Sequence, residues 1–181
     1  MKYALVTGGS RGIGRAACVK LAKMGYNILI NYRSNNEAAE ETRRLVEAEG
    51  KTAVLMQFDV ADGQAVKEVL ATWMETNKET MSIEVLVNNA GILRDKSFHK
   101  MSVEDFNLVM QVHFEGTLNC THTVFPVMRE QAFGRIIFTS SSSGVFGNFG
   151  QSNYGSAKMA MIGLMNTLII NDYEYNYQKI R

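Results

Sequence analysis

TGGSRGIG occupies residues 7–14, directly after a short apolar run at residues 3–6. A stretch of helical period follows over residues 12–24 and ends at Gly25, so the loop joins a predicted strand, residues 3–7, to a predicted helix. Glycines at such a junction let backbone amides approach a pyrophosphate, and the helix N-terminus contributes partial positive charge. The sequence therefore predicts a dinucleotide site; a plain strand-to-helix turn, which needs one glycine, is the weaker alternative.

The spacing of Gly8, Gly12 and Gly14 differs from the common GxGxxG fingerprint, so the strand and helix around the loop carry the interpretation. These glycines and their neighbours offer backbone amides, one hydroxyl group and one guanidinium group to an anion. The loop residues expected to contact the coenzyme are Gly8, Ser10, Arg11, Gly12, Ile13 and Gly14.

Strand-length apolar runs alternate with helical periods along the whole chain, which is typical of a parallel α/β sheet. Further strands are predicted at residues 27–32, 52–58, 83–87 and 135–140, and further helices at residues 36–49, 62–76, 103–128 and 154–168. No repeat, low-complexity tract or linker interrupts the pattern. The predicted fold class is α/β, a doubly wound parallel sheet (Rossmann fold), in a single domain over residues 1–181.

Composition excludes several classes of function. Of 181 residues, 19 are basic and 18 acidic, and no basic stripe gathers aromatic side chains, so a nucleic-acid partner is not expected. The two cysteines, Cys18 and Cys120, lack metal-ligand spacing and fit two semi-buried thiols in a reducing compartment. Neither a signal peptide nor an apolar run of about 18 residues is present, so we expect a cytoplasmic protein without a membrane partner.

The end of the second predicted strand favours one coenzyme over another. It reads Asn31-Tyr32-Arg33-Ser34 and lacks the acidic side chain that would bind the ribose 2′-hydroxyl of NAD. Arg33 and Ser34, with Arg11 from the glycine loop, can instead meet a 2′-phosphate. We therefore expect NADP (NADPH), with NAD less favoured; an Arg33 that is merely solvated is the alternative.

Two other strand ends carry small polar residues, and ligands of open α/β sheets bind beyond such ends. The third strand ends in DV at residues 59–60, and the fourth runs into NNAG at residues 88–91. Asp59 has an alternative role as a helix cap, and asparagine-rich turns are common. The residues expected to contact the coenzyme here are Asp59, Val60, Asn89, Ala90 and Gly91.

Tyr154 and Lys158 stand four residues apart at the start of a predicted helix, so their side chains share one face. A phenol is a poor acid or base at neutral pH, but a neighbouring ammonium favours the phenolate. Taken alone the pair is a weak signal, because a packed tyrosine beside a surface lysine is common.

The motifs together resemble the short-chain dehydrogenase/reductase family. They occur in that family's order, namely TGGSRGIG at 7–14, Asp59, NNAG at 88–91, the serine run at 140–143, and Tyr154 with Lys158. The resemblance implies hydride transfer between a nicotinamide and a carbonyl or hydroxyl carbon. It also implies that Tyr154 donates the proton, that Ser141 orients the carbonyl oxygen, and that Lys158 binds the nicotinamide ribose and favours the phenolate of Tyr154. Tyr154 and Lys158 thus also contact the coenzyme, and Ser140 or Ser142 remain alternatives to Ser141.

The central helix departs from the family pattern at His113. The family usually has an asparagine there, which holds a water of the proton relay. Histidine can also hold water and titrates near neutrality when unperturbed, so His113 is a candidate catalytic residue. A histidine that only packs the helix is an equal alternative.

Other segments narrow the expected substrate. Residues 31–34 and 147–154 are similar to beta-ketoacyl carrier-protein reductases and acetoacetyl-CoA reductases, and residues 91–151 to the 3-hydroxyacyl-CoA dehydrogenase domain of multifunctional beta-oxidation enzymes. The first hypothesis is therefore reduction of a 3-oxoacyl thioester of CoA or acyl carrier protein, in fatty acid biosynthesis. The alternatives are a 3-hydroxyacyl-CoA dehydrogenase, another alcohol dehydrogenase of the family, and a catalytically silent nucleotide-binding or assembly protein.

The last residues depart from the family as well. Family members usually continue through another strand, a substrate-covering segment and a final strand. Here the sequence turns polar after Ile169, and residues 179–181 could begin a strand. We expect an open sheet edge, in a fragment of a longer chain or in a protein whose partner supplies the missing surface. The resemblance also implies a homotetramer or dimer packed through residues 103–128 and 154–168.

Overall fold

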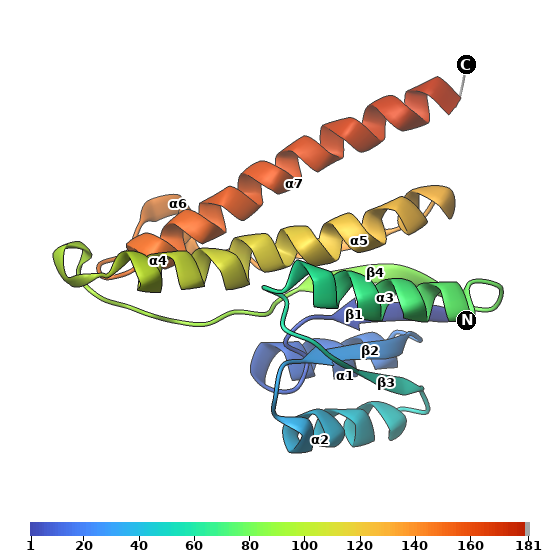
Figure 1. Cartoon of the computed structure of the whole chain (residues 1–181). Coiled ribbons are helices and arrows are strands. Elements are labelled where there is room, and N and C mark those ends of the chain that lie inside the picture. Colours follow the sequence, from blue (N-terminus) through green and yellow to red (C-terminus); the bar gives the residue numbers. More distant parts are fainter. Residues whose placement is uncertain (180–181) are drawn as a thin grey trace.

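The computed structural model describes the backbone of residues 1–179 and the side chains of residues 1–169. Its centre is a five-stranded, fully parallel sheet in the order β3-β2-β1-β4-β5 (Figure 1). The strands are β1 (Lys2–Val6), β2 (Asn27–Tyr32), β3 (Ala53–Gln57), β4 (Ser82–Asn88) and β5 (Arg135–Phe138). This is the strand order of a doubly wound dinucleotide-binding sheet, so the predicted fold class is confirmed.

Helices lie between successive strands, and two more follow the last described strand, β5. They are α1 (Gly12–Lys23), α2 (Asn36–Glu47), α3 (Gly63–Asn77), α4 (Val103–Met110), α5 (Gly116–Glu130), α6 (Ser142–Phe146) and α7 (Ser152–Lys179), with a short 3₁₀ helix at Phe98–Lys100. Side chains cap four N-termini: Asn35 caps α2, Asp62 caps α3, Ser102 caps α4 and Ser141 caps α6. The glycines after α1 and α2, Gly25 and Gly50, have φ of +98° and +72°, which lets the chain turn back toward the sheet.

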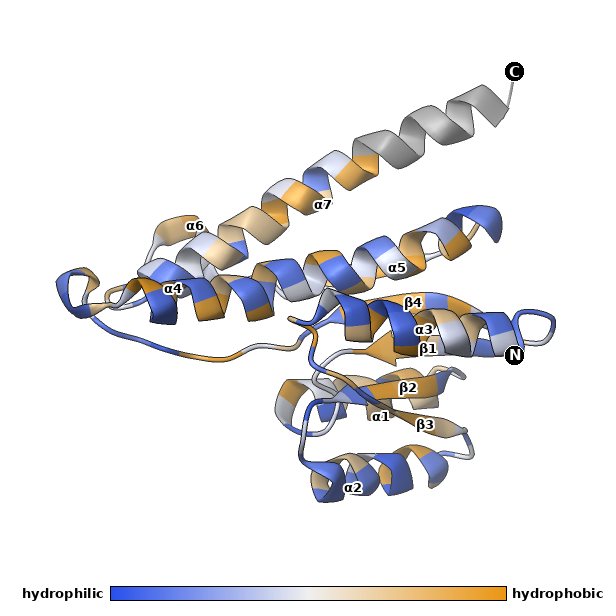
Figure 2. Ribbon diagram, viewed as in Figure 1, coloured by the Kyte–Doolittle hydropathy of each residue, from blue (hydrophilic) through white to orange (hydrophobic). Residues whose placement is uncertain are grey.

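The helices form two layers around the sheet. Cys18 and Ala22 of α1 and Val46 of α2 pack on one face, against buried side chains such as Ile28 and Val85. The other face is covered by α3 and α5, whose buried hydrophobic side chains are Val66, Leu70, Cys120, Val124 and Met128. Figure 2 shows the resulting contrast between the hydrophobic β1 and β2 and the largely hydrophilic α2. Because both faces are covered, the central strands are apolar along their length rather than alternating.

Several local features differ from the expectations. The long helical region at 103–128 is present but contains a π turn at Gln111–Glu115 and runs to Glu130. The helix α6 was not predicted, because serine and glycine are weak helix formers. The expected strand start at residues 179–181 is wrong at Lys179, which is helical in α7, and the other two residues lie outside the described part.

β5 forms one edge of the described sheet. Within the described residues β5 pairs only with β4, and Ile137 is 49% exposed although its neighbour Val87 is 6% exposed. Both cysteines are fully buried rather than semi-buried, and burial raises the pKa of each thiol to about 12. No helix in the described residues has the length and apolar character to cross a membrane.

Candidate functional site

The loops after β1 and β4 meet where the strand order reverses, which is where open α/β sheets bind ligands. Thr7 joins them, because its Oγ1 accepts hydrogen bonds from the backbone N–H of Asn89 at 2.9 Å and Ala90 at 3.0 Å. In return the Asn89 side-chain amide donates to the Thr7 carbonyl at 3.0 Å. Thr7, which is 2% exposed, was missed by the sequence analysis, which assigned it to the strand.

Three glycines of the loop are poorly replaced by other residues, Gly14 because of its close contacts and Gly8 and Gly12 because of their backbone conformation. A Cβ on Gly14 would lie 2.2 Å from the Gly8 carbonyl oxygen and 2.7 Å from Nδ2 of Asn89. Gly8 and Gly12 have φ of +62° and +55°, in the left-handed region that favours glycine. A Cβ on Gly12 would meet nothing within 4 Å, so this side of the loop is open space.

The N-terminus of α1 faces that space without a side-chain cap. Arg11 is the N-cap residue, and its side chain makes no hydrogen bond to the helix. Ile13 is 73% exposed beside it, and Ser10 is half-buried. Unpaired N–H groups at a helix start attract phosphate, so the residues present fit a pyrophosphate.

Two residues that the sequence analysis did not assign to the site hold the glycine loop from behind. The Arg15 guanidinium donates to the Ser10 carbonyl at 2.8 Å and to Thr42 Oγ1 at 3.0 Å, and pairs with Glu41 at 2.9 Å. The Asn31 side chain accepts from the Gly8 N–H at 3.1 Å and donates to two carbonyls of the β3 end. These contacts span 23 or more residues for Asn31 and up to 27 for Arg15, so no local pattern announces them.

The residues expected to distinguish NADP from NAD lie at the ends of β2 and β3. Nε of Arg33 lies 3.1 Å from Oδ2 of Asp59, with the Arg33 side chain 69% exposed. Ser34 is exposed on the same turn. Asp59 is not the cap of α3, since Asp62 has that role; Asp59 instead accepts from the Ala61 N–H.

Val60 is buried, unlike its neighbour Asp59, whose side chain is partly exposed. It is 5% exposed, and its carbonyl accepts a hydrogen bond from the Asn119 side chain at 2.9 Å. A Cβ on Gly116 would lie 2.6 Å from Val60 Cγ2, so α5 lies directly against it. Only the backbone of Val60 is therefore suited to line a coenzyme site.

Lys158 and Tyr154 form the chemical centre of the site. Lys158 is 3% exposed; its Nζ donates to the Thr139 carbonyl at 2.5 Å and lies 5.5 Å from the centroid of the Tyr154 ring. Burial lowers the pKa of Lys158 to about 8, and no carboxylate among the described residues pairs with it. The alternative of a packed tyrosine beside a surface lysine is therefore wrong. The Tyr154 hydroxyl has no hydrogen-bond partner within the described part of the chain.

The serine run lies against the helix that carries this pair. A Cβ on Gly144 would lie 2.9 Å from Cβ of Lys158, so α6 packs directly on α7. Ser140 donates to the Lys158 carbonyl and Ser143 to Gln151, which engages both hydroxyl hydrogens. Ser141 caps α6 by accepting from the Ser143 N–H at 3.2 Å, so its own hydroxyl hydrogen is uncommitted.

His113 packs beside the tyrosine from the π turn. Its ring meets that of Tyr154 edge to face, with centroids 5.1 Å apart, and a Cβ on Gly91 would lie 2.3 Å from its Cε1. Nε2 lies 3.0 Å from the Ile92 N–H and 2.8 Å from the Ile92 carbonyl, while the buried Nδ1 has no partner. Burial lowers the pKa of His113 to about 4, so the expectation that it titrates near neutrality is wrong.

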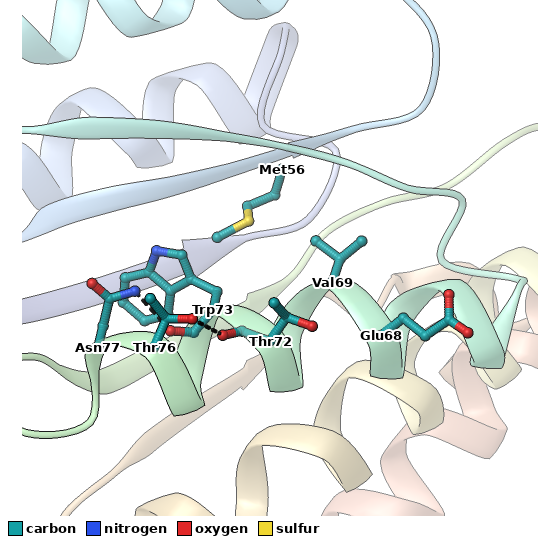
Figure 3. Close-up of a pocket in the computed structure, with 7 residues that line it drawn as sticks. All are labelled: Met56, Glu68, Val69, Thr72, Trp73, Thr76 and Asn77. Atoms are coloured by element: carbon teal, nitrogen blue, oxygen red, sulfur yellow. Dashed lines mark hydrogen bonds between the residues drawn. The ribbon is translucent and has the colours of Figure 1, made fainter.

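An open groove of about 510 Å³ lies elsewhere, between α3 and β3. Figure 3 shows its lining, with Trp73 and Val69 of α3 on one side and Met56 on the other. None of the predicted site residues contributes to it. The groove is therefore separate from the candidate site. Within the described residues, no group of three or more potential ligands is placed to hold a metal ion.

Comparison with known proteins adds an independent finding. A family model described as short chain dehydrogenase matches residues 2–181. The chain is 41% identical over 175 residues to peroxisomal multifunctional enzyme A of Dictyostelium discoideum, covering 92% of this chain and 38% of that protein. It is 41% identical over 183 residues to peroxisomal multifunctional enzyme type 2 of Drosophila melanogaster, covering 97% of this chain and 30% of that protein.

A smaller relative matches equally well. The 3-oxoacyl-[acyl-carrier-protein] reductase of Staphylococcus epidermidis is 40% identical over 166 residues, which cover 92% of this chain and 67% of that enzyme. The chain thus spans about a third of the two multifunctional relatives and two thirds of the reductase.

Proposed function

The chain belongs to the short-chain dehydrogenase family, and on this premise we propose that it reduces a 3-oxoacyl thioester to the 3-hydroxyacyl thioester with NADPH. The observation that carries the proposal is the buried ammonium of Lys158, which lies beside the Tyr154 ring and has no carboxylate partner among the described residues. A charge held 3% exposed without a carboxylate partner destabilises a fold, so it is expected where chemistry requires it.

The coenzyme is held by the residues of three strand ends. The uncapped start of α1 and the open side of Gly12 receive the pyrophosphate, and Arg33 with Arg11 meets the 2′-phosphate. Arg33 has to exchange part of its contact with Asp59 for the phosphate. When bound, the reduced nicotinamide supplies a hydride to the carbonyl carbon of the substrate.

The proton is delivered by this chain's own side chains. Tyr154 donates its hydroxyl proton to the carbonyl oxygen as the hydride reaches the carbon, and the Lys158 ammonium stabilises the phenolate that is left. Ser141 donates its uncommitted hydroxyl hydrogen to the same oxygen and so orients the substrate. His113, neutral at pH 7, holds the Tyr154 ring from its edge and offers Nδ1 to a water that returns the proton.

The relatives support the substrate class. One is named as a 3-oxoacyl-[acyl-carrier-protein] reductase, which favours reduction in fatty acid biosynthesis. A second candidate is oxidation of a 3-hydroxyacyl-CoA with NAD, since one relative is named as a peroxisomal hydratase-dehydrogenase-epimerase. The relatives named as peroxisomal favour a peroxisomal rather than cytoplasmic location. We favour the NADPH-dependent reductase, because no acidic side chain stands at the end of β2 where NAD would need one. As part of the same proposal, the chain forms a single domain and assembles as a homo-oligomer.

The test is turnover of acetoacetyl-CoA with NADPH, followed by the absorbance of the reduced nicotinamide. Tyr154→Phe is expected to lower turnover by about 10²- to 10⁴-fold, since it removes only the proton donor. Tyr26→Phe, the same change at a tyrosine that packs beneath Lys2, is the control and should keep full turnover. Coenzyme binding without turnover of any carbonyl by the unmodified chain would favour the silent nucleotide-binding alternative. Faster turnover with NAD and 3-hydroxybutyryl-CoA would favour the dehydrogenase.

A further inference from the structure

The irregular segment Gly91–Ser97 faces the residues that precede α7. It follows directly on NNAG and contains no helix or strand. The Lys96 N–H donates to the Gly150 carbonyl at 2.9 Å, and the Asn153 side chain donates to the Arg94 carbonyl at 3.0 Å. These two contacts bring the Asp95 side chain opposite Gln151.

Gln151 uses both ends of its side-chain amide. Its Nε2 donates to Asp95 Oδ2 at 2.8 Å, and its Oε1 accepts from Ser143 Oγ at 2.8 Å and Asn148 Nδ2 at 3.0 Å. The Ser143 N–H in turn donates to Ser141 Oγ at 3.2 Å. A continuous chain of hydrogen bonds therefore runs from the 91–97 segment to the serine that orients the substrate carbonyl.

We propose that Gln151 is a positioning residue, which holds the 91–97 segment against the serine run and thereby fixes Ser141 relative to Tyr154. The Gln151 amide carries a donor and an acceptor on one rigid group, so it serves Asp95 and Ser143 together. Gln151 acts through these neighbours and not on the reacting atoms. This inference rests on the proposed function, because it assigns Gln151 a part in carbonyl reduction.

The test reverses one hydrogen bond and leaves the others in place. Gln151→Glu keeps an acceptor for Ser143 and Asn148 but sets a carboxylate oxygen against the Asp95 carboxylate. Asp95→Asn alone retains an acceptor for Gln151. The double variant Gln151→Glu, Asp95→Asn restores a donor and an acceptor with their direction exchanged.

Two readouts are measured on the whole chain. One is kcat and KM for acetoacetyl-CoA at saturating NADPH; the other is the rate of trypsin cleavage after Arg94 and Lys96, which needs no activity. Gln151→Glu is expected to lower kcat/KM and to raise cleavage by about tenfold each, with NADPH affinity unchanged. Asp95→Asn and the double variant should stay within about threefold of the unmodified chain.

A matched control exists on α3. Gln64 Nε2 donates to Glu68 Oε1 at 2.7 Å, an exposed amide-to-carboxylate pair within α3. Gln64→Glu makes the same chemical change and should leave both readouts unaltered. The proposal is overturned if Gln151→Glu behaves like Gln64→Glu, or if the double variant is no better than the single one. Should the unmodified chain fail to reduce acetoacetyl-CoA, the proposed function fails, and the cleavage rates still decide whether Gln151 holds the segment.

Discussion

Replacing Lys158 by methionine should stabilise the fold while abolishing turnover. Burial lowers the pKa of Lys158 from 10.5 to about 8, and each pKa unit corresponds to 1.36 kcal/mol, so the buried charge costs about 3 kcal/mol. Methionine has a similar length and would lie beside Met161. It leaves the Thr139 carbonyl without its donor, which costs about 1 kcal/mol. The expected net gain in the free energy of unfolding at pH 7 is therefore about 2 kcal/mol.

The gain should depend on pH in a defined direction. Below about pH 8 the lysine is protonated in both the folded and the unfolded chain, so the full penalty applies. Between about pH 8 and 10.5 the folded chain holds the neutral amine while the unfolded chain still binds the proton. The stability of the unmodified protein therefore rises over this range relative to the variant, and the advantage of methionine shrinks.

Urea unfolding of both proteins at about pH 7 and pH 9.5 measures the effect. Lys67→Met, at an exposed lysine of α3, is the control and should change stability by no more than about 0.5 kcal/mol. The reasoning is refuted if Lys158→Met is less stable than the unmodified protein at pH 7. It is also refuted if the variant's gain in free energy of unfolding is the same at both pH values. In the unmodified enzyme, kcat/KM should fall as the pH rises through about 8, because the ammonium is lost.

Two further predictions concern the coenzyme and the histidine. Arg33→Ala removes a guanidinium that can bind a phosphate. The Kd for NADPH should therefore rise by about 10- to 100-fold while the Kd for NADH stays unchanged, as measured by titration of nicotinamide fluorescence. An equal loss of affinity for both coenzymes would contradict this prediction. Burial lowers the pKa of His113 to about 4. The unmodified enzyme and His113→Asn should therefore show the same slope of log kcat/KM against pH between about pH 5.5 and 7.5. A slope found only in the protein that has the histidine would mean that the imidazole titrates in this pH range.

The chemistry of the candidate site was only partly readable from the sequence. The four-residue spacing of Tyr154 and Lys158 predicts that they share a helix face, and the structure places them so. Their spacing does not say that Lys158 is buried, because Thr139 and α6, which precede α7 in the chain, pack against it. The same limit applies to His113, whose low pKa follows from burial beside a loop 21 residues away.

Hydrogen bonds between segments that are distant in the chain could not be predicted from the sequence. Thr7 joins two loops about 80 residues apart, and Asn31 joins three strand ends. No motif or period marks them, because both depend on which strands become neighbours in the sheet. A polar residue beside a strand end could be predicted to contact a ligand. Its hydrogen bonds to other loops of the same chain could not be predicted.

The sequence by itself determined the fold class, the place of the glycine loop and the alternation of the five strands with most of the helices along the chain. These follow from local periodicity and from glycines at one junction, and local rules act over a few residues. Only the tertiary structure decided which polar groups are buried, which are paired and which are left uncommitted. Those properties arise when segments distant in the sequence pack together and exclude water, and no short stretch of the chain contains that information.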